Sequence, residues 1–197
     1  MSGPPSPALE PMPGPRLPGD LVVWLLVLVE LLTFGMLFIA FAAARLREPA
    51  VFAAGQATLD LNSGALNTVL LVSASGCAAR ALHAVRGGRS TAGARWLLGA
   101  LACALGFLAV KGHEYADKWR EGIDVANNTF YLLYVMLTGF HFLHAAVGCL
   151  LFALLWPPTQ RGAYGPGHCH ALETGTVFWH MVDLLWMVLF PLVYVLR

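Results

Sequence analysis

The chain has 197 residues, of which 58% are hydrophobic and 12% are charged, and its mean hydropathy is +0.67. Soluble globular domains carry roughly 25% charged residues, so this composition excludes an ordinary soluble protein and indicates one that is embedded in a membrane. The formal net charge is only +1 and no basic stripe is interleaved with aromatic residues, which excludes nucleic acid as a partner.

The first 44 residues divide into a tail and an apolar run. Residues 1–19 are crowded with proline and carry no basic segment ahead of an apolar one, so they do not have the pattern of a cleavable signal peptide, and we expect a disordered tail. The run over 21–44 is too long for the core of a signal peptide and is followed by Arg45 and Arg47. It therefore predicts a first transmembrane helix.

Four further apolar stretches are each long enough to cross a membrane as a helix, over residues 65–85, 96–115, 129–156 and 172–196. The breaks between them are rich in the Gly, Pro, Asn and charged residues that end membrane helices. Backbone polar groups in lipid must be paired within the chain. The sequence therefore predicts an all-α, polytopic bundle of five transmembrane helices over residues 20–197.

The loop between the second and third predicted helices has the highest density of positive charge. Arg80, Arg86, Arg89 and Arg95 lie in or beside it, and no acidic residue lies among them. By the positive-inside rule, this loop and the N-terminus are expected on the cytoplasmic side.

Ionisable side chains within the spans are the candidate functional groups, because placing each one in hydrocarbon costs on the order of 3 kcal/mol or more. A helix rises about 1.5 Å per residue, and on this basis Glu30 is expected near the middle of the first helix. We predict that it is a separate buried acid. It could handle protons, contact a lipid headgroup or form a hydrogen bond to a neighbouring helix.

A second group of ionisable residues is predicted to meet across the last three helices. Its members are Glu114 on the third helix, His141 and His144 on the fourth, and Glu173, His180 and Asp183 on the fifth. Residues three or seven apart share a helix face, so the polar faces of the fourth and fifth helices are expected to meet. An intramembrane hydrogen-bond network that fixes helix packing is the favoured interpretation, and a metal site or a proton path are the alternatives.

Three smaller patterns bear on cofactors. Lys111 and Glu114 are three residues apart and predict a structural ion pair. Two histidines three apart on one helix point the same way, so they cannot hold a single haem iron from both axial sides. The tripeptide His168, Cys169 and His170 has metal-binding atoms, but no second cluster follows at zinc spacing.

Five segments carry a resemblance to a known family. They are VELLTFGMLFIAF around Glu30, LNTVLLVSAS at 66–75, GHEYADKW at 112–119, TGFHFLHAAVG at 138–148 and ETGTVFWHMVDLLWMVLF at 173–190. In this order they resemble the third to seventh helices of subunit III of the haem-copper cytochrome oxidases. Glu30 matches the family's carbodiimide-reactive membrane glutamate. The resemblance implies a bundle that lacks the first two helices, with no haem, metal or other cofactor and no catalysis by the chain alone.

Short five-helix members of this family include the accessory proteins of nitric oxide reductases in denitrifying bacteria, and the opening LPGDLVVWLLVLVELLTFGMLF is closer to that type. The resemblance implies an accessory subunit of the bacterial inner membrane that binds lipids and the catalytic subunit of a nitric oxide reductase or a cytochrome c oxidase. The reductase is favoured. The subunit would support assembly, stability or proton uptake in respiratory electron transport.

Two rival functions come from other classes of protein. An independent membrane metalloenzyme or electron carrier could use the intramembrane histidines and carboxylates as ligands. A transporter or proton conductor could be built around Glu30, but the sequence has no inverted repeat and no helix broken at mid-membrane by Gly and Pro.

Overall fold

The structure, a computed structural model, describes residues 20–123, 125–126 and 128–196. Within these residues the regular elements are all helical: α1 (Leu21–Arg47), α2 (Pro49–Ala57), α3 (Leu61–Arg86), α4 (Ser90–Arg120), α5 (Thr129–Gln160), α6 (His170–Phe190) and the π-helical turn η1 (Pro191–Val195). Five of the described helices, α6 being continued by η1, are long and apolar enough to cross a membrane. The predicted all-α bundle of five spans is confirmed. The tail predicted for residues 1–19 lies outside the described residues.

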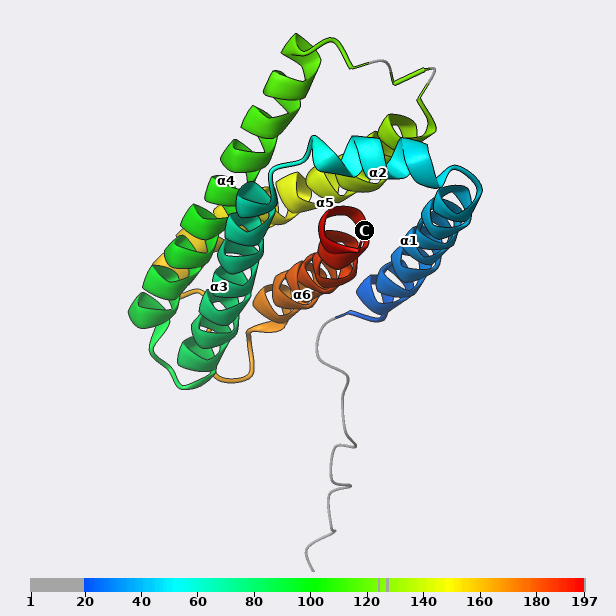
Figure 1. The fold of residues 1–197 in the computed structure, drawn as a ribbon. Coiled ribbons are helices and arrows are strands. Elements are labelled where there is room, and N and C mark those ends of the chain that lie inside the picture. The colour runs from blue at the N-terminus through cyan, green and yellow to red at the C-terminus, as the bar shows by residue number, and fades with distance from the viewer. Residues whose placement is uncertain (1–19, 124, 127, 197) are drawn as a thin grey trace, which may run out of the picture.

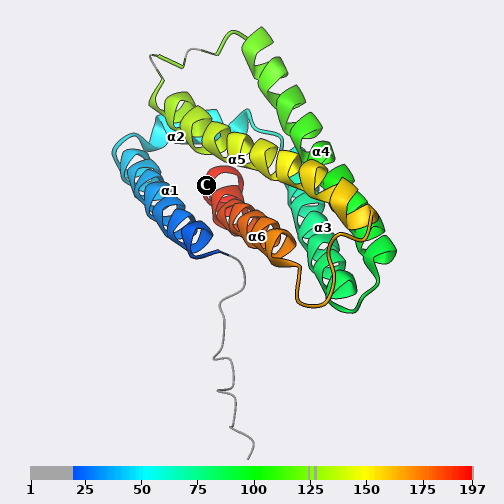
Figure 2. The same cartoon turned by 180° about the vertical axis from the view of Figure 1, so that it is seen from behind.

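The long helices form a bundle in which α6 has a central place, with α1 on one side and α3 on the other (Figures 1 and 2). Helix α6 packs against α1, α3 and α5, and α4 packs against α3 and α5. The start of α1 and the α3–α4 and α5–α6 connections share one end of the bundle, called here the α3–α4 end. Helix α2, the end of α4 and the start of α5 lie at the other end, called here the α2 end.

Helices α3 and α4 pack closely because small residues line their interface. Gly88, with a φ of 74°, allows the tight turn between them, a backbone conformation that glycine adopts without steric cost. Gly93 lies so close to Val85 that an added Cβ would be 2.5 Å from its side chain. The alanines that are buried on the two helices are Ala74, Ala78, Ala81, Ala84, Ala94, Ala100 and Ala104. Such residues let backbones approach in a membrane, where dispersion rather than hydrophobicity holds helices together.

The helices extend a few residues beyond their predicted limits, because polar residues at their ends find partners. Helix α3 starts at Leu61 because the Asp60 carboxylate accepts from the backbone N–H of Ser63 at 3.2 Å and so caps the first turn. Helix α4 continues to Arg120, whose guanidinium donates to Asp117 one turn earlier at 3.0 Å.

The segment 48–64, expected only as a break between two spans, contains helix α2. Pro49 occupies its first turn, where the missing N–H costs nothing. The buried side chain of Gln56 donates to the backbone carbonyls of Val193 and Leu196, both at 2.9 Å. Helix α2 thus holds the C-terminal turn. At nine residues it is too short to span the membrane, so the sequence does not reveal this role.

Candidate functional site

Glu30 on α1 and His144 on α5 form a polar pair between two membrane helices. Glu30 Oε2 lies 3.2 Å from His144 Nε2, and the other ring nitrogen, Nδ1, lies 2.6 Å from the carbonyl oxygen of Phe140. A carbonyl oxygen only accepts, so Nδ1 carries a hydrogen. The contact between Nε2 and Oε2 is then bridged by one proton, which belongs to the imidazole or to the carboxyl group. Glu30, predicted to be a separate acid, has His144 as its partner.

His141, one turn before His144, has a different neighbourhood. Its ring is fully buried, and Nε2 lies 3.0 Å from the carbonyl oxygen of Val182 on α6. The rings of Phe107 and Trp186 lie 5.5 and 5.1 Å away, centroid to centroid. Because Nε2 donates to the carbonyl, Nδ1 of the neutral ring is an acceptor, and no described residue donates to it. His141 therefore joins α5 to the backbone of α6.

Ser75 on α3 connects two of the predicted site residues on α6. Its hydroxyl donates to Asp183 Oδ2 at 2.8 Å, and His180 Nδ1 lies 3.3 Å from the same hydroxyl oxygen. A serine has only one hydroxyl hydrogen, which Asp183 receives, so His180 must donate from Nδ1 to Ser75. Sequence reasoning missed Ser75, although a serine inside an apolar span is itself a signal for a contact between helices.

Glu173 lies at the α3–α4 end, apart from the other predicted site residues. Its Oε1 accepts from Arg86 Nη2 at 2.8 Å and from Cys169 Sγ at 3.0 Å. Burial raises the pKa of the Cys169 thiol, which favours the protonated, donating form. This contact turns the cysteine of the tripeptide 168–170 toward Glu173.

A buried lysine joins three elements near the α2 end. The fully buried Lys111 Nζ donates to Glu114 Oε1 at 3.0 Å, which confirms the predicted ion pair. It also donates to the hydroxyls of Tyr134 on α5 at 2.9 Å and Tyr194 on η1 at 2.5 Å. Both tyrosine hydroxyls in turn donate to Glu114 Oε1, at 2.5 and 2.7 Å. We call these four residues the Lys111 cluster. Glu114 belongs to this cluster rather than to a group with the histidines.

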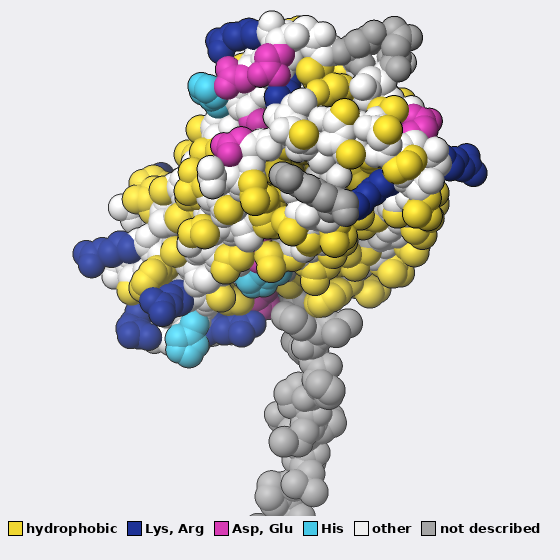
Figure 3. Space-filling model, viewed as in Figure 1, with side chains coloured by type: hydrophobic (Ala, Val, Ile, Leu, Met, Phe, Trp, Pro, Cys, Tyr) yellow, Lys and Arg dark blue, Asp and Glu magenta, His cyan; other side chains and the backbone are white. Residues whose placement is uncertain are grey.

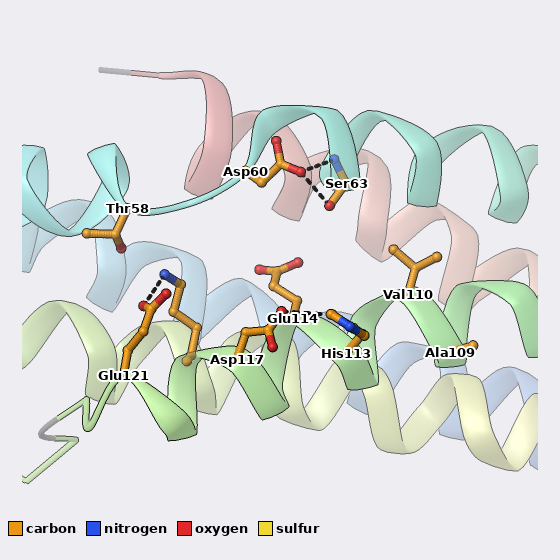
Figure 4. Close-up of a pocket in the computed structure, with 10 residues that line it drawn as sticks. Thr58, Asp60, Ser63, Ala109, Val110, His113, Glu114, Asp117 and Glu121 are labelled. Atoms are coloured by element: carbon orange, nitrogen blue, oxygen red, sulfur yellow. Dashed lines mark hydrogen bonds and ion pairs between the residues drawn. The ribbon is translucent and has the colours of Figure 1, made fainter.

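A pocket of about 550 Å³ opens beside the Lys111 cluster, between the start of α3 and the end of α4 (Figure 4). Asp60 and Ser63 lie on one side, and the Glu114 carboxyl group points into the space from the other. Hydrogen bonds from the Ser63 hydroxyl, and then from backbone N–H groups, lower the pKa of Asp60. Glu114 Oε2 has no hydrogen-bond partner among the described residues.

The structure places the predicted network residues in separate clusters. His180 and Asp183 come together through Ser75, whereas Glu114, His141, His144 and Glu173 each have other partners. Within residues 20–123, 125–126 and 128–196, no three His, Cys, Asp or Glu side chains are grouped so that they could hold a metal ion. The arrangement can join helices and, at His144 and His180, hold protons.

Comparison with known proteins matches this sequence to one family. A family model described as cytochrome c oxidase subunit III matches residues 19–197. A cytochrome c oxidase subunit 3 from Synechocystis sp. is 32% identical over 175 residues, which cover 88% of this chain and 74% of the relative. The same protein from Thermostichus vulcanus is 30% identical over 85% of this chain and 82% of its own length. A probable cytochrome c oxidase subunit 3 from Nocardia farcinica is 27% identical, over 89% and 86%.

The five apolar helices, with polar side chains paired between them, define a multi-pass membrane protein. The match over residues 19–197 and the 32% identical relative identify it further. The chain belongs to the cytochrome c oxidase subunit III family, as the motif resemblance predicted.

Proposed function

We propose that this chain is a non-catalytic accessory subunit of a haem-copper oxidase superfamily complex and binds the catalytic subunit of that complex. The family match over residues 19–197 carries the proposal. The internal polar groups support it, because His141, Ser75 and the Lys111 cluster each join two or more helices. Polar groups that join helices fix the shape of the bundle, as expected of a subunit that binds a partner and does not catalyse a reaction.

The partner is a cytochrome c oxidase or a nitric oxide reductase. The named relatives favour the first, since they are called cytochrome c oxidase subunit 3. The opening segment from Leu17 to Phe38 favours the second, because it resembles the short accessory proteins of the reductases. The two candidates share the same class of catalytic subunit, so the role proposed here is common to both.

Membrane lipids are the second proposed partner. Helix α1 is the least buried span, with 11% of its most apolar window buried. Leu25, Leu28 and Leu32 are each more than half exposed on it. An apolar surface of this kind is stable only when lipid or another membrane protein covers it.

We place the α3–α4 end in the cytoplasm of a bacterium, with the protein in the inner membrane. Arg86 and Arg89 lie at this end, and dark blue side chains gather without magenta ones beside them at the corresponding lower left of Figure 3, whereas dark blue and magenta side chains are mixed at the top. This distribution supports the orientation under the positive-inside rule. A fluorescent or phosphatase fusion to the N-terminus tests it, and phosphatase activity there would contradict it.

Deletion of the chain from its native host tests the accessory role. The visible haem spectrum of the membranes reports complex yield, and oxygen or nitric oxide consumption over many turnovers reports durability. A role in assembly lowers the haem signal, whereas a role in stability or proton uptake leaves that signal normal and makes activity decline during turnover. Wild-type chain, and as a matched control the E48Q variant with a change outside the clusters, should restore both. Unchanged spectrum and activity after deletion would contradict the proposal.

A further inference from the structure

Two pockets meet at the His180 side chain. The first, of about 340 Å³, lies between α3 and α6 and has Arg86, His83 and Glu173 among its lining residues. The second, of about 360 Å³, lies between α1 and α6 and has Trp24 in its apolar lining. Arg86 is the last residue of α3, so the first pocket extends from the charged surface of the α3–α4 end down to His180. The exposed His180 side chain lines this pocket, so the pocket offers a path between that surface and the imidazole.

The imidazole has one nitrogen available to these pockets. Nδ1 donates to Ser75, as the single hydroxyl hydrogen of that residue requires. In the neutral ring Nε2 is then a bare acceptor. Beyond Ser75 lies Asp183, about 20 Å along α6 from its start and so near mid-membrane. Asp183 Oδ1 is buried, and no described residue donates a hydrogen bond to it.

We propose that His180, Ser75 and Asp183 form a proton relay, which carries a proton from the surface of the α3–α4 end to the Asp183 carboxylate inside the membrane. In the first step Nε2 of His180 accepts a proton from a hydronium ion in the pocket, and water remains there. In the second, Nδ1 gives its hydrogen to Ser75 Oγ while Ser75 gives its own to Asp183 Oδ2.

The relay conserves atoms and charge. New bonds form at Nε2–H, Oγ–H and Oδ2–H, while one O–H bond of the hydronium, the Nδ1–H bond and the original Oγ–H bond break. The products are a neutral Asp183, a serine with one hydrogen and a neutral histidine protonated at Nε2. Exchange of the ring proton with pocket water restores the starting tautomer.

The other titratable groups around the relay have different contacts or lie at the mouth of the pocket. They are His83 and Arg86 on α3, Glu173 on α6 paired with Arg86, His141 on α5 bonded to Val182, and Glu30 on α1 paired with His144 on α5. Ser75 therefore provides the described link between His180 and Asp183. The relay needs only this chain, so it stands or falls independently of the partner proposed above.

Infrared spectroscopy of the purified full chain in lipid nanodiscs tests the relay. The carbonyl band of a protonated carboxyl group, assigned to Asp183 by its loss in D183N, is followed after a rapid drop in pH. We expect the band to rise about 100-fold more slowly in S75A and in H180Q, the scale of a lost proton-transfer group. S75T, which keeps the hydroxyl, and S73A, which removes an exposed serine on the same helix, should keep the wild-type rate.

Circular dichroism and gel filtration verify that each variant is folded, and H180Q carries the test where S75A fails to fold. Equal rates in wild type and either relay variant would overturn the proposal. So would an Asp183 that shows no protonated band at any pH at which the chain remains folded.

Discussion

His144 Nε2 lies 3.2 Å from Glu30 Oε2, so a polar pair holds α1 against α5 within the membrane. The ring of Phe34, one turn after Glu30, packs edge-on against the same imidazole, with centroids 5.6 Å apart. Helix α1 has few other buried residues, Phe34 and Phe41 being the ones that are completely enclosed. The attachment of the first span thus depends on a small number of contacts.

Replacement of Glu30 separates its charge from its hydrogen bond. In E30Q the amide N–H can donate to His144 Nε2, so the free energy of unfolding should stay within about 0.5 kcal/mol of wild type. E30L leaves that nitrogen without a donor and should cost about 1 kcal/mol. Denaturant unfolding of the purified chain in mild detergent measures both, with L32A on the exposed face as control. Equal losses in E30Q and E30L would contradict the hydrogen-bond account.

The Lys111 cluster predicts strong coupling between two residues. K111M leaves the buried Glu114 carboxylate without its cation and should destabilise the chain by about 3–5 kcal/mol. In K111M/E114Q no buried charge is left alone, so part of this loss should be recovered. Thermal and denaturant unfolding of the two variants, with E114Q alone completing the cycle, measures the coupling. If the double variant loses more unfolding free energy than the two single variants lose together, the predicted coupling is contradicted.

Spacing in the sequence predicts which helix presents a polar residue but not which neighbour receives it. His141 and His144 are three residues apart and so differ by about 60° around the helix. That difference turns His141 toward α6 and His144 toward α1. Lys111 and Glu114 belong to one helix, so their pairing could be predicted. Tyr134 and Tyr194 come from distant segments, and their approach depends on packing that no local pattern contains.

The five spans follow from length and hydropathy, and this prediction is confirmed. Helix α2 has no such signal, because its place depends on tertiary contacts, those of Gln56 with the C-terminal turn and of Phe52 with Phe41 and Phe130. A serine inside an apolar span predicts a contact between helices, but the two α6 residues that Ser75 meets are fixed only by packing.

Two glycines on α5 form a matched pair for a packing test. A Cβ at Gly148 would lie 2.5 Å from the buried Trp179 ring, whereas a Cβ at Gly139 would meet nothing within 4 Å. G148A should therefore cost about 1–3 kcal/mol through overpacking between α5 and α6. G139A should be neutral or gain up to about 1 kcal/mol in helix propensity. Thermal unfolding of both variants measures the difference, and equal melting temperatures would contradict the close approach of the two helices.

Asp60 gives the stability of the chain a dependence on pH. Its pKa in the folded protein is lower than the ordinary value of 3.8, so its contribution is complete well above that value and is lost as the pH falls through the folded pKa. D60N keeps the helix cap without a titrating group. The difference in unfolding free energy between wild type and D60N should be constant above about pH 5 and shrink below about pH 4. A difference that grows on acidification would contradict the assignment.

The central claim, that this chain is an accessory subunit of a haem-copper complex, is tested most directly by purification of the tagged chain from native membranes in mild detergent. Mass spectrometry identifies its partners, and a visible spectrum of the same sample reports haem. The account predicts that a haem-copper catalytic subunit is recovered in stoichiometric amount and that the haem follows that subunit when the two are separated. Recovery of the chain alone, with its own stoichiometric haem or metal, would contradict the account and make the histidines a catalytic centre.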